Sequence, residues 1–383
     1  MIPWLIILLQ VSSAPGNLTI REGGTYSGNF QNITVATAQP VIIENCTLRG
    51  PGPLISTSVS GVHLTIRNCS GFGENPNITG KSKGGFLDAY QPASLDIEHN
   101  RIEGIGGYGI NVNEYARDAN AGDTIKILYN ELHDIDGRFS DGNGGWQNSG
   151  DPTPHAIILQ HVHGVAGIEI GWNQIINEPG SSYVNDVINI FESSGTRDSH
   201  LMIHDNYIQG LYAIDPLKEY DSGCGIITDG SNDPAIATAF VEIANNQVIS
   251  TGNGGICIAA GHDNVLHNNR ILSAGRLPDG SAVFAQNIGC YIHPMNPADP
   301  GAFHGNGAYR NLIGWLRPPH TTENQSAETA RGDWWLPDGD IDPVLTHDNI
   351  DWSGEITPET EKAELARWQK KLRDAGATVG PLG

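Results

Sequence analysis

The sequence predicts an all-β solenoid, in which short strands stack in parallel from one coil to the next, with inserted loops and one C-terminal helix. Three observations lead to this prediction. A short strand motif recurs through most of the chain, glycine is abundant at 48 of 383 residues, and the clearest helical segment lies near the C-terminus.

The recurring motif is a strand with alternate apolar residues, followed by Asn, one further residue and a branched apolar residue. Six clear copies place this Asn at Asn100, Asn130, Asn173, Asn206, Asn246 and Asn269. Asn311 and, in a looser copy, Asn68 extend the series. The spacing varies from 23 residues (Asn246 to Asn269) to 43 (Asn130 to Asn173), so loops of different length are inserted between fixed strands.

A second strand motif with period-2 apolar positions precedes most of these copies. It appears at Gly109–Val112, Val187–Ile190, Gly225–Thr228, Gly255–Ile258 and Gly289–Ile292. One such repeat cannot bury its apolar side alone, so repeats must stack, with strands paired in parallel at ~4.8 Å. We expect each Asn to occupy the bend between strands, where it tolerates left-handed backbone angles and joins a ladder of side-chain amides.

This pattern of Asn bends and Gly-Ile-x-Ile strands resembles the right-handed parallel β-helix superfamily, the pectate-lyase-like fold, over residues 17–315. The resemblance implies a single-stranded right-handed β-helix. Members of the superfamily include polysaccharide lyases, glycoside hydrolases, uronate epimerases, esterases, phage tailspikes and adhesins, so the resemblance does not select an activity. A β-sandwich or jelly roll is the competing architecture, but it would need hairpin turns between successive strands.

The two ends of the chain differ from the repeats. Residues 1–16 are either a secretory signal, with Trp4–Leu9 as its apolar part, or an N-terminal strand or cap. Residues 316–383 form a C-terminal extension with a helix over about 357–375, which Thr357 begins and Gly376 ends. We expect this helix to dock on the body and to cover an open end. The five cysteines are expected to be buried free thiols.

The charge balance limits the partners. A net charge of -22 opposes binding to nucleic acid, because phosphates need a basic surface. No apolar run approaches the ~18 residues that span a bilayer, so the chain is not expected to cross a membrane. Together with the resemblance, this indicates a secreted or extracellular protein, whose oligomeric state the sequence leaves open.

A functional site must lie on the outside of the solenoid, because its interior is packed. The strand registers place one stacked row of polar and aromatic side chains outward. We expect Glu192 and Asp229 to act as a catalytic pair, assisted by His161, with carboxylates ~5–9 Å apart as in glycoside hydrolysis. The expected substrate-binding residues are Asn189, Phe191, Arg197, Gln160, Tyr291 and His293. The alternative is that both carboxylates are solvated residues at strand ends.

The function expected from this face is a carbohydrate-active enzyme that cleaves or modifies a polysaccharide in a groove, most readily a glycoside hydrolase. The alternatives are a non-catalytic glycan-binding surface or virion protein, and a Ca²⁺-dependent polysaccharide lyase. No cofactor is firmly implied. Asp134, Asp136 and Asp141 can either bind Ca²⁺ or lie in a solvated turn. The acidic charge favours a neutral or weakly charged glycan over an anionic one.

Overall fold

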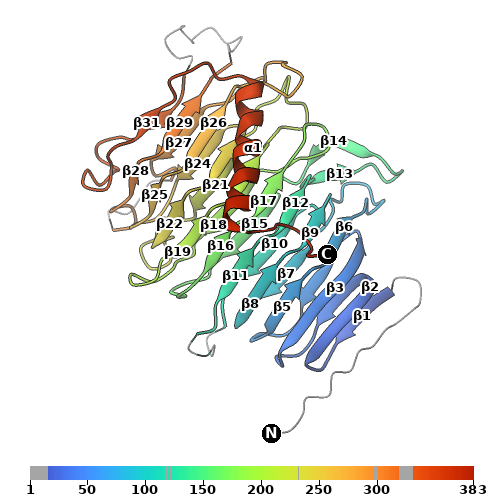
Figure 1. Cartoon of the computed structure of the whole chain (residues 1–383). Coiled ribbons are helices and arrows are strands. Elements are labelled where there is room, and N and C mark those ends of the chain that lie inside the picture. Colours follow the sequence, from blue (N-terminus) through green and yellow to red (C-terminus); the bar gives the residue numbers. More distant parts are fainter. Residues whose placement is uncertain (1–15, 117–119, 121, 232, 297–300, 319–330) are drawn as a thin grey trace.

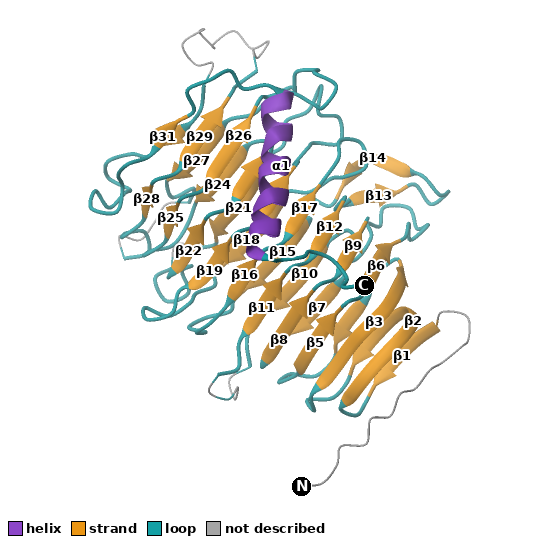
Figure 2. Ribbon diagram, in the orientation of Figure 1, coloured by secondary structure: helices purple, strands orange, loops and turns teal. Residues whose placement is uncertain are grey.

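The computed structural model describes residues 16–116, 120, 122–231, 233–296, 301–318 and 331–383. Twenty-nine strands join in one continuous sheet that winds along the chain (Figure 1). The strand pairings of that sheet are parallel, whereas β13 (Arg138–Ser140) and β14 (Trp146–Gly150) form a separate antiparallel hairpin. The predicted all-β solenoid with parallel stacking is confirmed, and α1 (Pro358–Ala375) is its helix (Figure 2).

The strand pairings form three series, each with one strand per coil, which we call the first, second and third faces. The first face contains β4 (Ile55–Thr57), β7 (Leu87–Tyr90), β10 (Tyr108–Asn113), β15 (His155–Gln160), β18 (Asp186–Phe191), β21 (Cys224–Asp229), β24 (Gly254–Ile258), β27 (Ile288–Ile292) and β30 (Trp334–Trp335). The second face contains β5 (His63–Arg67), β8 (Ser94–Glu98), β11 (Ile125–Leu128), β16 (Glu169–Gly171), β19 (Leu201–His204), β22 (Val241–Ala244), β25 (Val265–His267) and β28 (Gly307–Tyr309). The third face contains β6 (Ser70–Gly73), β9 (Arg101–Glu103), β12 (Glu131–His133), β17 (Gln174–Ile176), β20 (Tyr207–Gln209), β23 (Gln247–Ile249), β26 (Arg270–Ser273), β29 (Leu312–Trp315) and β31 (Ile350–Asp351).

The first coils are built from longer strands. The stack begins with β1 (Gly16–Ile20), β2 (Gly24–Val35) and β3 (Val41–Gly50). β3 is long enough to pair with β5 in the second face and with β6 in the third. At the other end, β30 and β31 pair with β27 and β29, so the coils continue beyond residue 315.

The core lies inside the coil and follows from the alternating apolar positions. In the first face, five isoleucines stack in register with no exposed surface. They are Ile110, Ile157, Ile188, Ile226 and Ile256. Burial of one such row per face supplies the apolar stabilisation that a single repeat lacks. The five cysteines are buried and free, as expected.

The bends between the second and third faces are two residues long in every coil from β8 to β29. The second residue of each bend is the repeated Asn, and the amides form the predicted ladder. Asn246 Nδ2, for example, donates to Asn269 Oδ1 (3.0 Å) and to the Ile203 carbonyl (2.9 Å), and Asn246 Oδ1 accepts from Asn206 Nδ2 (3.0 Å). Each amide therefore ties three consecutive coils together.

We expected the ladder Asn itself to take the left-handed backbone conformation, and that prediction is wrong. The left-handed residue is the one that precedes it, such as Asp205 (φ 53°) before Asn206 and Asn245 (φ 59°) before Asn246. Likewise, Asn68 (φ 53°) holds the left-handed position, and Cys69 occupies the ladder position, where its N–H donates to Asn100 Oδ1 (3.0 Å). The amide must point inward to reach its neighbours, so the preceding residue makes the turn.

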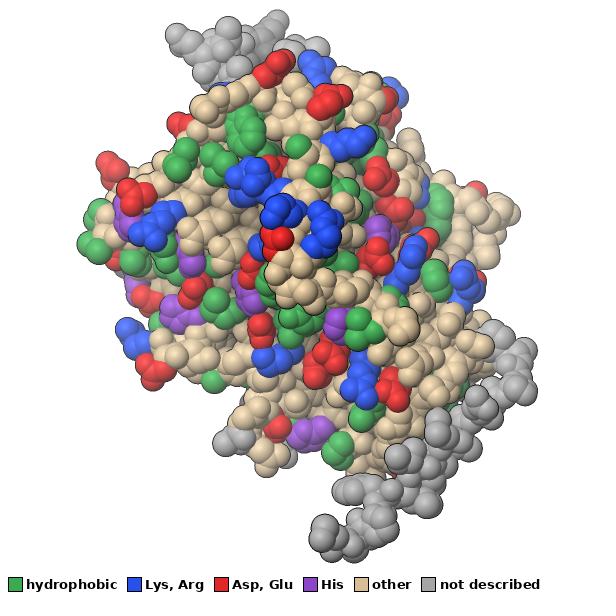
Figure 3. Space-filling model, in the orientation of Figure 1, with side chains coloured by type: hydrophobic (Ala, Val, Ile, Leu, Met, Phe, Trp, Pro, Cys, Tyr) green, Lys and Arg blue, Asp and Glu red, His purple; other side chains and the backbone are tan. Residues whose placement is uncertain are grey.

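The C-terminal helix α1 lies along the third face, not over an open end. Trp368 and Leu372 pack against Tyr207, Ile249 and Leu272, which belong to three successive strands of that face. The Trp368 indole N–H also donates to Gln174 Oε1 (3.1 Å). Basic side chains gather over this helix in the space-filling view (Figure 3). No helix among the described residues is long and apolar enough to cross a bilayer.

The longer insertions flank the first face on both edges. Between the third and first faces they include 134–154, 177–185, 210–223 and 274–287. Between the first and second faces they include 114–124, 161–168, 192–200, 230–240 and 293–306. We call the outward side of the first face, which these loops flank, the floor of the groove, and binding or catalytic residues commonly lie on such loops.

Candidate active site

Two outward rows of side chains make up the floor of the groove. In register, one row runs Asp88, Asn111, Ile158, Asn189, Ile227, Cys257 and Tyr291, and the other runs Tyr90, Asn113, Gln160, Phe191 and Asp229. The strand registers predicted from the sequence therefore place Asn189, Phe191, Gln160, Tyr291 and Asp229 on one face. The first coils present polar groups and the last coils present apolar ones.

Amide side chains link neighbouring coils across this floor. Gln160 Nε2 donates to Asn111 Oδ1 (2.8 Å), and Asn111 Nδ2 donates to Asp88 Oδ1 (2.9 Å). Asn189 Nδ2 donates to Asp186 Oδ2 (3.1 Å) and, more weakly, to Asp229 Oδ2 (3.5 Å). The Asn189 amide thus joins two carboxylates on adjacent coils.

Glu192 and Asp229 lie on neighbouring coils at the edge of the floor. The Glu192 N–H donates to the Asp229 carbonyl (3.2 Å), and Glu192 takes a left-handed conformation (φ 43°) that ends β18. Their carboxylates turn different ways. Glu192 Oε2 lies 3.1 Å from His161 Nδ1, and its Oε1 accepts from Ser231 N–H (2.9 Å). Asp229 Oδ1 accepts from Gly230 N–H (2.7 Å).

His161 connects this pair to solvent. Its side chain is 42% exposed, whereas that of Glu192 is 8% exposed. Its ring also meets the edge of the Phe191 ring, with centroids 5.6 Å apart. A cleft of about 750 Å³ opens beside His161 and is lined across from it by Glu114, Tyr115 and Asp123. Burial, and then the neighbouring His161, lower the pKa of His163 in this cleft.

A buried acidic cluster lies next to the floor, and sequence analysis missed it. Asp186 opens β18 and accepts from the Cys224 N–H (2.8 Å). Burial, opposed by the Cys224 N–H and reinforced by the charge of Asp229, raises the pKa of Asp186 to about 7. Burial lowers the pKa of the adjacent His155 to about 4. The available signal was an Asp that opens an otherwise apolar strand, Asp186-Val-Ile-Asn-Ile-Phe.

A second, smaller hollow borders this cluster on the other wall of the groove. It has a volume of about 380 Å³ and is lined by Tyr183, Asn185, Tyr220 and Asp221, among others. Burial raises the pKa of Asp221 to about 6, although backbone N–H groups of Gly223 and Ser222 oppose the shift. Titratable groups with shifted pKa values therefore lie on both sides of the floor, as is common at functional sites.

Four of the predicted binding residues lie away from Glu192 and Asp229 or are covered. Asn189 is 2% exposed. Tyr291 is 6% exposed and packs in an apolar cluster with Ile227 and Cys257. His293 follows β27, three coils or ~14 Å beyond Glu192, and its Nδ1 lies 2.8 Å from Asp340 Oδ2. Arg197 is exposed and its guanidinium lies 5.5 Å from the Phe240 ring centroid.

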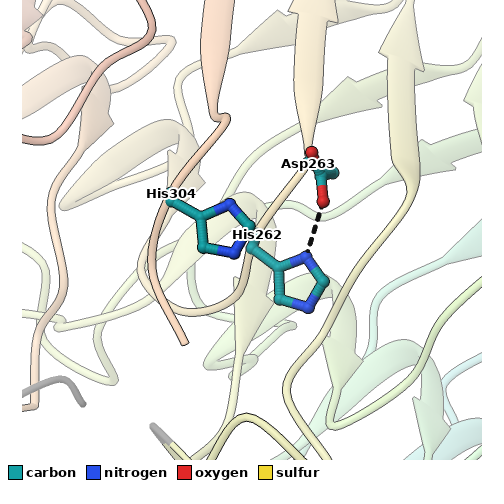
Figure 4. Close-up of side chains that lie close together, drawn as sticks. All are labelled: His262, Asp263 and His304. Atoms are coloured by element: carbon teal, nitrogen blue, oxygen red, sulfur yellow. Dashed lines mark hydrogen bonds and ion pairs between the residues drawn. The ribbon is translucent and has the colours of Figure 1, made fainter. Parts of the chain in front are cut away.

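The three aspartates that the sequence suggested as possible Ca²⁺ ligands each bind different groups of the protein. Asp136 is buried and pairs with Lys83 (3.0 Å) and Arg138 (2.7 Å). Asp134 Oδ1 accepts from the Glu178 N–H (2.8 Å), and Asp141 Oδ1 accepts from two backbone N–H groups of its own turn. Within the described ranges, the one group of three side chains spaced for a metal ion is His262, Asp263 and His304 (Figure 4).

Comparison with known proteins adds no relative: no family model matches the chain, and no curated protein matches it.

Proposed function

We propose that the protein is a carbohydrate-active enzyme with a pectate-lyase-like fold. It would act as a glycoside hydrolase that cleaves a glycan lying along the first face. The observation that carries this proposal is the placement of His161, Glu192 and Asp229 on three consecutive coils, with His161 lining a cleft of about 750 Å³. Two carboxyl groups flanking a bound sugar are the usual requirement of glycoside hydrolysis.

In this proposal the two carboxylates have different roles. Asp229 is oriented by the Gly230 N–H and the Asn189 amide, and it serves as base or nucleophile. Glu192 serves as the acid. It exchanges its proton with His161, which reaches the cleft and assists in proton delivery to the departing sugar oxygen.

The row of the floor that runs from Tyr90 to Asp229 offers partly exposed side chains to a sugar, whereas the other row is at most 8% exposed from Asn111 to Tyr291. Tyr90 is 48% exposed, and Phe191 lies in the same row three coils further on. Aromatic rings at both positions can cover apolar sugar faces. Four buried polar atoms near the site have no hydrogen-bond partner and can accept or donate to hydroxyl groups. They are Asn113 Oδ1, Tyr115 Oη, Asn189 Oδ1 and Ser231 Oγ.

The substrate we propose is a neutral or weakly charged glycan. The strands of the first face, β4 to β30 as described, contain no Lys or Arg. A uronate polymer would meet the Asp88, Asp229 and Glu114 carboxylates without a compensating cation. This also weighs against a lyase, which needs a cation to neutralise the uronate carboxylate.

A second candidate, glycan binding without cleavage, is favoured by one observation. Both Glu192 oxygens have protein partners and the side chain is 8% exposed, so the acid is not freely presented to a ligand. A rigid β-helix with an aromatic and amide floor would still hold a sugar chain.

One screen separates these functions. The purified protein is incubated with neutral and acidic polysaccharides, with and without a chelator, and products are analysed. We expect new reducing ends from a neutral glycan, unaffected by the chelator. Unsaturated uronate products lost on chelation would instead indicate a lyase, and binding without products would indicate the non-catalytic candidate.

Variants then test the assigned residues. Asp229→Asn and Glu192→Gln are expected to lower the rate of cleavage at least ~100-fold. Asp233→Asn is the matched control, because Asp233 is an exposed carboxylate of the same loop that caps the Ala235 N–H (2.9 Å). Unchanged activity in the first two variants would contradict the assignment.

A further inference from the structure

We propose that His262, Asp263 and His304 bind a divalent transition-metal ion of the zinc class. Their ligand atoms all lie within 4.8 Å of one another, and the three side chains approach from two consecutive coils (Figure 4). The inference does not depend on the proposed glycan chemistry. The site lies on the edge between the first and second faces, several coils beyond the Glu192–His161 pair.

The carboxylate and the first imidazole are already placed as a chelating pair. His262 Nδ1 and Asp263 Oδ2 are 2.8 Å apart. Two donor atoms bound to the same tetrahedral zinc ion are separated by about 3.4 Å, since each lies about 2.1 Å from the metal, so this pair needs to open by only about 0.6 Å. When an ion occupies this position, the imidazole proton shared with Asp263 resides on Nε2, and the ring stays neutral.

The second imidazole is held beside the first. The His262 and His304 rings stack with centroids 4.7 Å apart and planes 18° from parallel. The Asp263 N–H donates to the His304 carbonyl (2.9 Å), which fixes the two coils relative to each other. His304 is exposed, so its ring can turn about its side-chain bonds to direct a nitrogen at the ion.

Two other His-Asp pairs in the chain show which feature distinguishes the His262-Asp263 pair. His204-Asp205 and His347-Asp348 have the same Nδ1–Oδ2 pairing, at 2.8 and 3.1 Å, and their Asp residues take the same left-handed conformation, at the other edge of the second face. His347 stacks on a tyrosine, Tyr309, so that copy lacks a second imidazole. The His-Asp pair alone is thus a feature of left-handed bends, and His304 is what completes a ligand set.

The chemistry of the donors selects the ion. Two imidazoles and one carboxylate suit Zn²⁺, Co²⁺ or Ni²⁺, whereas Ca²⁺ and Mg²⁺ prefer oxygen ligands only. Three protein ligands leave one tetrahedral position for water. The ion would fasten the chain at His304 to the preceding coil, on the same edge of the groove as the 750 Å³ cleft.

The test uses tag-free full-length protein, stripped with a chelator and titrated with Co²⁺ as a spectroscopic probe. We expect saturable binding of one Co²⁺ per chain, with visible absorption bands that disappear when Zn²⁺ is added. Binding that never saturates, or that Zn²⁺ does not displace, would overturn the proposal.

Variants locate the ion. His304→Ala and Asp263→Asn are expected to weaken Co²⁺ binding at least ~10-fold, which is the lower bound for disturbing even an indirect metal contact. Asp263→Asn should fold normally, because Asn245 and Asn268 take the same left-handed conformation at the other edge of the second face. His347→Ala is the control and should bind as the unaltered protein does. Equal affinity in all four proteins would mean that His262 and His304 serve only as stacked rings.

Discussion

The two edges of the second face differ in the length of their connections and in the hydrogen bonds of their buried polar groups. At the edge shared with the third face, each bend is two residues long and each ladder amide bonds to the coils above and below. At the edge shared with the first face, the connections range from three residues (91–93) to fourteen (293–306). That edge carries Glu192, His161 and the buried Tyr115 and Ser231 hydroxyls that lack partners.

We interpret the first edge as scaffold and the second as the edge of the proposed functional site. A buried polar group without a partner costs free energy, so a fold selected for stability alone would pair it. In the described bends of the ladder edge one buried atom, His99 Nδ1, has no partner, whereas the described connections of the loop-bearing edge have three, Tyr115 Oη, His200 Nδ1 and Ser231 Oγ. The unpaired groups and the cleft therefore point to a ligand at the second kind of edge, and the following predictions test the comparison.

The largest effect is expected at the ladder. Asn246→Ala removes two donated and two accepted side-chain hydrogen bonds and leaves buried groups of Ile203 and Asn206 unpaired. We expect the free energy of unfolding to fall by about 5 kcal/mol, measured by urea titration with circular dichroism. Asn245→Gly, at the adjacent exposed left-handed residue, should change it by less than about 0.5 kcal/mol. Equal effects would contradict the structural role of the ladder.

The helix contact should have a comparable but slightly smaller effect. Trp368 has no exposed surface, and its ring stacks on Tyr207 with centroids 6.1 Å apart. Trp368→Ala is expected to lower the free energy of unfolding by about 4 kcal/mol. Proteolysis should then release α1 while the solenoid keeps its strand content. Simultaneous loss of both would show that the helix is part of the scaffold and not an addition to it.

Replacing the buried acid Asp186 should raise the free energy of unfolding at neutral pH, whereas replacing the ladder residue Asn246 should lower it. Burial raises the pKa of Asp186 from 3.8 to about 7, so the folded protein holds this proton more tightly than the unfolded chain. The stability that this proton provides is complete below pH ~4 and is lost as the pH rises through ~7. Asp186→Asn does not titrate, so relative to the unaltered protein it should gain up to ~4 kcal/mol between pH 4 and pH 8.

The opposing titration of His155 does not obscure this test. Its pKa is lowered to about 4, so its contribution is lost as the pH falls from 6.5 through 4. It is present in both proteins and cancels in their difference. A difference in stability that is independent of pH would show that the pKa of Asp186 is the same in the folded and unfolded states, which contradicts the raised value.

A smaller effect is expected from His161, which assists and does not carry the reaction. His161→Ala should lower the cleavage rate about tenfold to a hundredfold and leave the free energy of unfolding nearly unchanged, because the side chain is 42% exposed. A rate profile against pH is the informative measurement, since loss of an imidazole should change its shape. Loss of folding without a change in that profile would assign His161 a structural role.

The sequence predicted the scaffold well because the scaffold repeats. Ile188, Ile226 and Ile256 each lie in a strand that precedes a ladder Asn, and the alternation within that strand determines which side chains point inward. The site was less accessible to prediction. Asn189, Phe191 and Asp229 followed from strand alternation, but Asp186 and the His262–His304 pair did not, because loop lengths decide which side chains meet. The left-handed residues were misplaced by one position because sequence periodicity does not show which of two bend residues turns the chain.

The most direct test of the account is a comparison of cleavage and binding in Asp229→Asn on the glycan found by the screen. We predict that its affinity for an oligosaccharide of that glycan stays within about threefold, while release of reducing ends falls at least ~100-fold. Retained cleavage would contradict the catalytic role of Asp229, and binding by the unaltered protein without any cleavage would contradict the proposed hydrolase.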